Sequence, residues 1–159
     1  MKIIGIDPGL ERCGWAIVTE QNKKPRLEAV GCIVTKRIDL AERLLLLQTE
    51  LARVITTHQP TQAAVEELFF AKNTKTALVV AHARGVILVT LAQHKIPLTT
   101  FTPNAIKLAV CGNGHADKSQ VQRMIKAILG LRESPKPDDA ADAVAIALCG
   151  LQTKSFRSF

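Results

Sequence analysis

The stretch KIIGIDPG, residues 2–9, decides the fold, because it joins a buried strand to a carboxylate at its end. The run Lys2 to Asp7 is short and rich in β-branched residues, and Pro8-Gly9 follows it as a turn signal. In open α/β sheets, ligands bind in the crevice at the carboxyl ends of the strands. Asp7 is therefore a candidate functional carboxylate. The alternative is a turn aspartate whose side chain only accepts bonds from nearby backbone amides.

The segments that follow predict an antiparallel meander and then a crossover. Cys13–Thr19 and Leu27–Thr35 have the composition of strands, and their short connections favour antiparallel pairing with the first strand. A helix begins after its N-cap Asp39, with apolar residues at helical spacing. Ala63–Glu66 is a buried strand, and a right-handed crossover makes it parallel to the first.

Helices and strands alternate in the rest of the chain, so we expect an α/β fold with a mixed five-stranded sheet flanked by helices. The 159 residues suffice for one core. We expect one domain at residues 1–151 and a short basic C-terminal tail at residues 152–159. The remaining elements are a helix from about Thr74 to His94, a strand at Ile96–Phe101, and helices at Pro103–Val110, Lys118–Leu129 and Asp138–Leu151.

Composition favours a cytoplasmic protein with a polyanionic partner. The 21 lysines and arginines outnumber the 14 acids, and the net charge of +7 suits phosphate binding, although a merely soluble protein can carry it too. The four cysteines have the spacing of neither a zinc site nor a disulfide framework, which indicates thiols in a reducing compartment. The sequence has no run of membrane-spanning length and no signal-peptide pattern.

Two glutamates follow the apolar run AAV at residues 63–65. A carboxylate at the end of a buried strand is costly unless it is paired or binds a metal ion. Because side chains alternate along a strand, only one of Glu66 and Glu67 can face a given side of the sheet. The alternative is that both begin a solvated loop.

Three aspartates open the last expected helix, just after the helix-breaking sequence SPKP at residues 134–137. Asp139 and Asp142 are three residues apart and share one helical face, while Asp138 is placed as the N-cap. The alternative is that all three only stabilise the positive end of the helix dipole. Since the rest of the helix is apolar, two acids facing one way favour metal ligands.

These acids form an oxygen-only set without a neighbouring histidine or cysteine. Hard oxygen ligands select Mg²⁺ or Mn²⁺ over zinc. Two such ions, about 3.5 to 4 Å apart, can hold a phosphodiester and activate a water molecule. The pattern therefore predicts phosphodiester hydrolysis.

Five motifs, in the same order from residue 3 to about residue 150, resemble those of the RuvC-type Holliday junction resolvases. The first motif alone would be weak evidence for this family, because sugar kinases and actin-like ATPases also begin with a strand and an early Asp-Gly turn. The motifs are GIDPG at 5–9, VEELFFAKNTKTAL at 65–78, ARG at 83–85, DKSQVQ at 117–122 and DAADAVAIA at 139–147.

The resemblance implies an RNase H-like fold and symmetrical nicking of a four-way DNA junction in homologous recombination and DNA repair. It assigns the catalytic and metal-binding roles to Asp7, Glu66, Asp139 and Asp142, with Mg²⁺ as the metal, Mn²⁺ as a substitute and two ions per site. Glu67 departs from a common family pattern, in which an uncharged polar residue often follows the catalytic acid.

The resemblance also implies DNA contacts. Phe69 is assigned to stacking at the junction centre, since an aromatic side chain can hold an unpaired base. Core packing is its alternative interpretation. Lys72, Lys107 and Lys118 are assigned to phosphates, although a lysine is as often simply solvated.

A homodimer and the branch-migration proteins RuvA and RuvB are further partners that the resemblance implies. Ala77, Ala81 and Gly85 are spaced four residues apart and permit close helix packing, within the chain or across a dimer. The competing functions are another RNase H-like nuclease and a junction-binding protein without catalysis. An actin-like ATPase is disfavoured, because the chain is too short for two nucleotide-enclosing domains.

Overall fold

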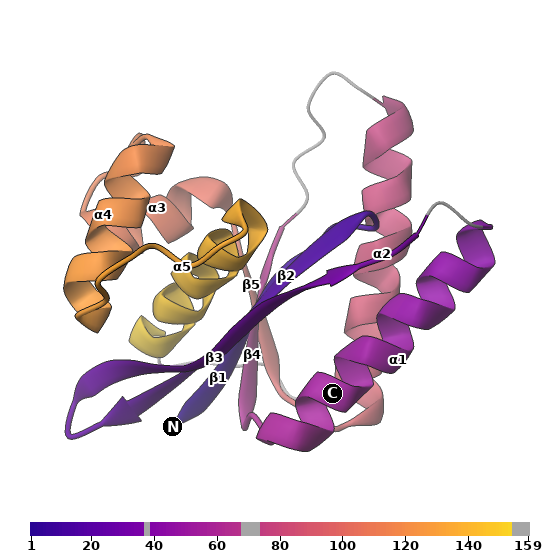
Figure 1. Cartoon of the computed structure of the whole chain (residues 1–159), viewed down its shortest axis with the longest axis horizontal. Helices are drawn as coiled ribbons and strands as arrows, with labels where there is room; N and C mark the ends of the chain where they lie inside the picture. The colour runs from indigo at the N-terminus through magenta and orange to yellow at the C-terminus, as the bar shows by residue number, and fades with distance from the viewer. Residues whose placement is uncertain (37–38, 68–73, 154–159) are drawn as a thin grey trace.

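A mixed five-stranded sheet lies between two groups of helices (Figure 1). The computed structural model describes residues 1–36, 39–67 and 74–153. The strand order is β3-β2-β1-β4-β5, which confirms the expected mixed five-stranded sheet. The strands are β1 (Lys2–Asp7), β2 (Arg12–Gln21), β3 (Lys24–Val34), β4 (Gln62–Glu66) and β5 (Leu98–Phe101). The helices are α1 (Leu40–His58), α2 (Thr74–Gln93), α3 (Pro103–Cys111), α4 (Lys118–Leu129) and α5 (Asp138–Gln152).

The pairing of the strands brings two carboxylate-bearing ends to the same edge. β1 pairs antiparallel with β2, and β2 antiparallel with β3, which confirms the meander. β4 pairs parallel with β1, with Ile6 opposite Val65, and β5 continues the parallel part. Because β1 and β4 run in the same direction, Asp7 and Glu66 end neighbouring strands.

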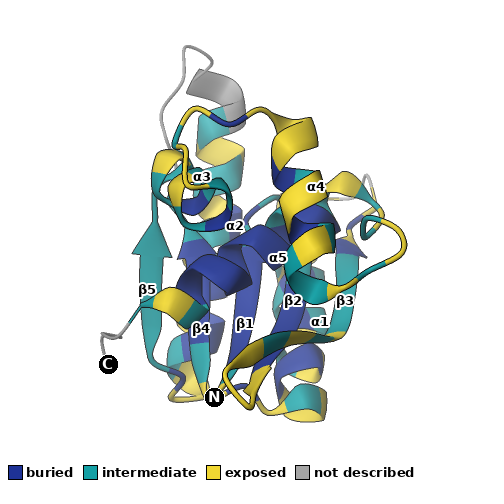
Figure 2. Ribbon diagram, turned by 90° about the vertical axis from the view of Figure 1, so that its left-hand side faces the viewer, coloured by how far each residue is buried: buried dark blue, intermediate teal, exposed yellow. Residues whose placement is uncertain are grey.

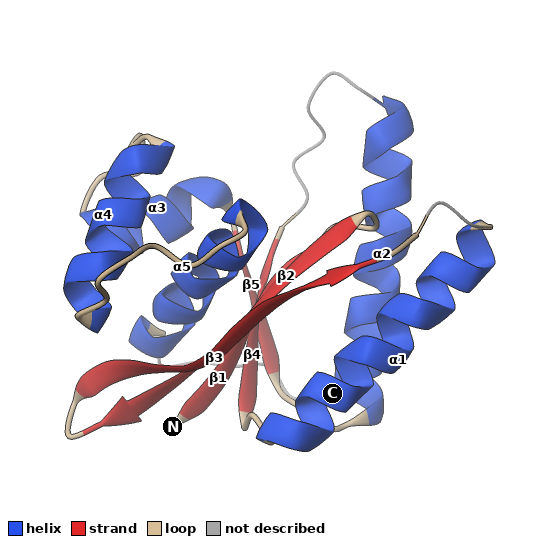
Figure 3. Ribbon diagram, in the orientation of Figure 1, coloured by secondary structure: helices blue, strands red, loops and turns tan. Residues whose placement is uncertain are grey.

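Each face of the sheet buries its own core. Helices α1 and α2 cover one face, where Ile4 and Ile6 are buried, and α3, α4 and α5 cover the other, where Ile3 is buried (Figures 1 and 3). The burial view shows α5 as the most deeply buried helix, with Ala140, Ala141 and residues 143–150 buried and its two ends more exposed (Figure 2). Side chains alternate along β1, so Asp7 shares the α5 side of the sheet with Ile3.

Two glycines let α5 lie directly on the sheet. A methyl group at Gly5 would overlap the backbone carbonyl of Ala143, and one at Gly14 would overlap that of Asp139. Both positions therefore require glycine for close backbone approach. Gly14 is also the register partner of Asp7, so this contact fixes the start of α5 beside the end of β1.

The observed elements differ from the predicted ones chiefly at their ends. β2 and β3 extend into residues 20–26, which the sequence pattern left as the connection between the two expected strands. The reason is that Asn22 and Lys23 adopt positive φ angles of 51° and 63° and close a two-residue hairpin. Helix α5 continues to Gln152, and residues 154–159 of the expected tail lie outside the described part of the chain.

The prediction that Asp138 caps α5 was wrong. The N-cap is Pro137, and Asp138 is the first helical residue. Its carboxylate lies 3.1 Å from the ammonium group of Lys118, and α5 begins without a side-chain capping bond. Among the described residues, none of the helices combines the length and apolar character needed to cross a bilayer.

Candidate active site

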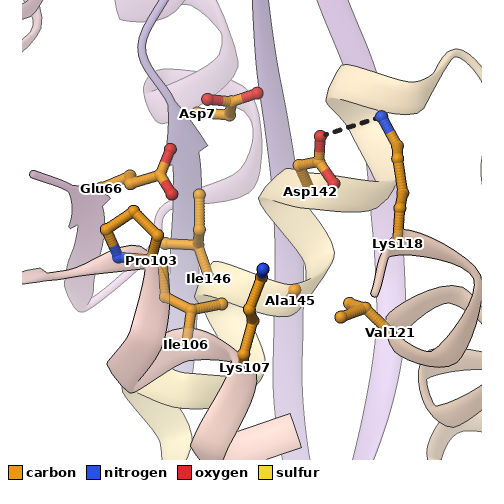
Figure 4. A pocket seen from close by; sticks show the side chains of 10 residues that line it. All are labelled: Asp7, Glu66, Pro103, Ile106, Lys107, Lys118, Val121, Asp142, Ala145 and Ile146. Atoms are coloured by element: carbon orange, nitrogen blue, oxygen red, sulfur yellow. Dashed lines mark ion pairs between the residues drawn. The ribbon is translucent and has the colours of Figure 1, made fainter. Parts of the chain in front are cut away.

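A pocket of about 230 Å³ opens where β1, β4, α3, α4 and α5 meet (Figure 4). Three of the predicted carboxylates, from Asp7, Glu66 and Asp142, line it. They come from two strand ends and the first turns of a helix, three segments far apart in the sequence. Two lysines and an apolar wall complete the lining. The other lining residues are Pro103, Ile106, Lys107, Lys118, Val121, Ala145 and Ile146.

Asp7 lies in the most strongly perturbed position of the site. The pKa of its carboxyl group is raised from 3.8 to about 7. Burial is the largest cause, the charges of Glu66, Asp142 and Asp139 add to it in that order, and Lys118 opposes them. A carboxyl group held among other carboxylates in a low-dielectric pocket ionises reluctantly. A bound cation would relieve that repulsion, so this position suits a metal ligand.

The other two pocket carboxylates have the same character. Burial is the main cause of the raised pKa of Glu66, and the charge of Asp142 raises it further. A side-chain hydrogen bond with Asp7 and the charge of Lys107 lower it. Burial also raises the pKa of Asp142, and Lys118 opposes it. The three oxygen donors fit a hard divalent cation chemically. Within the described ranges, however, no three acidic, histidine or cysteine side chains are already gathered around one point.

Two lysines bring positive charge to the mouth of the pocket. Lys118 begins α4, where Asp117 and Gln120 form a capping box that the sequence reasoning missed, although its D-x-x-Q signal lies in the DKSQVQ motif. The Lys118 ammonium lies 3.6 Å from a carboxylate oxygen of Asp142 (Figure 4). Lys107 extends from α3 into the same pocket.

The fourth predicted carboxylate, Asp139, is not among the residues that line this pocket. Its oxygen accepts a hydrogen bond of 2.7 Å from Nε of Arg12, the first residue of β2, and the two groups form an ion pair. A shallow groove beside the pocket is lined by Arg12, Lys136 and the first residues of α5. Arg12 carried no signal in the sequence, since it lies 127 residues away from its partner.

The structure distinguishes Glu66 from Glu67, whereas side-chain alternation alone did not say which of the two faces the site. Glu66 faces the pocket. Glu67 accepts a hydrogen bond of 2.8 Å from the hydroxyl group of Thr100, and its backbone amide donates to the carbonyl oxygen of Phe101. Glu67 is thus engaged with β5. The other two predicted DNA contacts, Phe69 and Lys72, lie outside the described residues.

Fold and site together define an α/β protein with acidic oxygens and lysines at the end of its central strands, a class suited to cleaving phosphate esters. A protein-family model described as "Crossover junction endodeoxyribonuclease RuvC" matches residues 3–150. The crossover junction endodeoxyribonuclease RuvC of Roseiflexus sp. (strain RS-1) is 50% identical over 149 residues, which cover 93% of this chain and 89% of the relative.

Two solved structures agree with this match. The structure of Thermus thermophilus RuvC has a TM-score of 0.90 and 32% identity and covers 100% of both chains. T. thermophilus RuvC in complex with a Holliday junction substrate has a TM-score of 0.91 and 32% identity, and covers 100% of this chain and 99% of that one. The chain belongs to the RuvC family, and its fold is RNase H-like.

Proposed function

We propose that this protein is a structure-specific DNA endonuclease that resolves four-way (Holliday) junctions in homologous recombination and DNA repair. The observation that carries the proposal is the family match over residues 3–150, and the pocket that gathers Asp7, Glu66 and Asp142 supports it. The complex of the similar Thermus protein with a Holliday junction supports the same substrate. The net charge of +7 is favourable for binding DNA.

The reaction assigned to the pocket is metal-dependent hydrolysis of a phosphodiester. The RuvC family is one of metal-dependent nucleases, and the oxygen-only donor set favours Mg²⁺, with Mn²⁺ as a substitute. We assign the ligand roles to Asp7, Glu66, Asp139 and Asp142, for two ions in each site. When bound, the ions supply positive charge that lowers the pKa of a water molecule and stabilises the leaving oxygen.

The chain's own residues would position the DNA for this chemistry. Lys107 and Lys118 face the carboxylates across the pocket and would hold the scissile phosphate against the repulsion of the acids. Lys118 already binds carboxylate oxygens of α5, so its ammonium group is held at the pocket mouth. Phe69 remains our candidate for stacking on a base at the junction centre, and Lys72 for a further phosphate.

We propose a homodimer that pairs along α2. Leu78 and Val89 of this helix are 61% and 54% exposed, and Gly85 lies between them on the same helical side. A methyl group added at Gly85 would meet none of the described atoms within 4 Å, so no described segment of this chain makes the close approach that the small residue permits. Two α2 helices packed together would present two sites to a two-fold symmetric junction.

The family likeness also leads us to propose the cytoplasm as location and RuvA and RuvB as branch-migration partners. Neither assignment draws on a particular residue of the pocket. Co-sedimentation with purified RuvA–RuvB on junction DNA would test the partnership.

Strand-specific cleavage assays test the substrate and the metal together. A synthetic four-way junction, labelled on each strand in turn, is incubated with Mg²⁺ or with chelator, beside a linear duplex and an RNA–DNA hybrid of the same sequence. We expect paired nicks at symmetry-related positions of the junction, and only with the metal. Binding without any cut would support a junction-binding protein without catalysis. Equal cutting of the hybrid would support another RNase H-like nuclease.

A further inference from the structure

Asp139 stands apart from the other acidic residues because a basic side chain already holds it. Asp7, Glu66 and Asp142 line the pocket, whereas Asp139 binds Arg12 at its edge. The bond of 2.7 Å joins Nε of Arg12 to a carboxylate oxygen, which is the short length of a charge-assisted hydrogen bond.

The backbone around the pair leaves its main chain little room to move. The carbonyl oxygen of Asp139 lies against Gly14, and Gly9 lies against the carbonyl of Arg12, each so closely that a methyl group on either glycine would overlap it. Both residues are thus closely packed through their backbone at the end of β1. Only the side chains of Arg12 and Asp139, which are 43% and 31% exposed, are free to change partners.

We propose that Arg12 is a positioning residue that holds Asp139 at the pocket edge and competes with the metal ion for this carboxylate. The inference rests on the proposed function, in which Asp139 is a metal ligand. An oxygen bonded to a guanidinium group must give up that bond before it can serve as a ligand. Arg12 therefore weakens metal binding in the free protein while it keeps the carboxylate neutralised and oriented.

Mn²⁺ binding to the full chain without DNA measures this competition directly, by electron paramagnetic resonance of the free ion. Arg12→Met keeps the length and apolar stem of the side chain but removes the guanidinium group. We expect it to tighten Mn²⁺ binding about fivefold, since an exposed ion pair is weak. Arg12→Lys retains the charge and is expected to lie between the two. Unchanged or weaker Mn²⁺ binding by Arg12→Met would overturn the proposal.

Lys136→Met is the matched control for charge. Lys136 lines the same groove as Arg12, while the ion pair that the structure gives to Asp139 is with Arg12. Removing its charge should change the dissociation constant less than about twofold, because exposed charges are screened by salt. An effect as large as that of Arg12→Met would mean that any nearby positive charge acts in this way, and the specific competition would be refuted.

A double-mutant cycle then tests whether Arg12 acts through Asp139. In the Asp139→Asn background, Arg12→Met should leave Mn²⁺ affinity unchanged, because the contested carboxylate is gone. A fivefold effect that persists there would contradict the proposal. Failure of the wild-type protein to bind Mn²⁺ would also contradict it.

The junction assay separates this inference from the proposed function. Metal-dependent junction cleavage without coupling between Arg12 and Asp139 in Mn²⁺ affinity would support the nuclease function and refute only the role of Arg12. The reverse result, a coupled cycle without junction cleavage, would retain the competition at a metal site and remove the resolvase function.

Discussion

Asp7 makes the stability of the metal-free protein depend on pH. Its pKa of about 7 in the folded chain lies above the ordinary value of 3.8, mainly because of burial. The folded state therefore binds more protons than the unfolded state between these values. Its stabilising contribution is complete below the unfolded pKa and is lost as the pH rises through the folded pKa.

We accordingly expect the free energy of unfolding to fall between pH 4 and pH 7 in the presence of chelator. The contribution of Asp7 is at most about 1.4 kcal/mol per pH unit. Urea unfolding at several pH values would measure the slope, and Asp7→Asn should flatten it, because the amide does not titrate. An identical slope in Asp7→Asn would show that Asp7 is not the responsible group.

Lys107 and Lys118 are each proposed to contact a phosphate of the junction. Replacing either by methionine should weaken junction binding and reduce the slope of log K against log salt by about 1, because one fewer counterion is released. Lys95→Met is a matched control, since Lys95 is exposed beyond α2 at the opposite end of the strands. Titrations of labelled junction from low to moderate salt would give the slopes. Equal slopes for all variants would remove the two lysines from the phosphate contacts.

Single residues mark the limit of what the sequence could predict. Because side chains alternate along a strand, Glu66 and Glu67 must face opposite sides of the sheet, but the sequence does not say which side holds the site. The structure shows that the site lies on the side covered by α5, which Glu66 faces. Asp138 is a residue type typical of an N-cap, yet the helix begins one residue earlier than that role requires, with Pro137 as the N-cap. The pair between Arg12 and Asp139 arises from tertiary packing alone, so no local pattern indicated it.

At the scale of elements, α5 depends on glycines in the strands beneath it. Gly5→Ala would place a methyl group on the backbone of Ala143 and force α5 away from β1. We expect the free energy of unfolding to fall by about 1 to 3 kcal/mol or more, as overpacking typically costs. The displaced helix should also misplace Asp142 and slow cleavage.

Chemical denaturation and junction cleavage together would check the Gly5→Ala prediction. Stability and activity equal to those of the wild type would mean that the sheet and α5 adapt without strain.

The elements themselves could be predicted because their signals are local. The β-branched run before Asp7, the apolar spacing after Asp39 and the apolar segment after Asp142 each predicted an element of the type that is observed. Strand ends were less certain, because the hairpin at Asn22-Lys23 needs positive φ angles at both residues, which Asn adopts readily but Lys does not favour.

At the scale of the whole molecule, the exposed apolar side of α2 should hold the dimer. Leu78→Glu would bury a charge in the proposed interface, and we expect it to shift the protein from dimer to monomer. Leu108→Glu on α3 is the matched control, because Leu108 is 57% exposed on the other face of the sheet. Sedimentation velocity would distinguish the species. A dimer that survives Leu78→Glu would refute pairing along this side of α2.

The central claim is that the carboxylates at the ends of β1 and β4 are required for metal-dependent cleavage of the junction. Comparing the wild type with Asp7→Asn on one labelled four-way junction, in Mg²⁺, tests it most directly, with binding measured in parallel. We predict two symmetry-related nicks by the wild type and none by Asp7→Asn, which should bind the junction as tightly or more tightly because it has lost a negative charge beside the phosphates. Cleavage by Asp7→Asn at the wild-type rate would contradict the account.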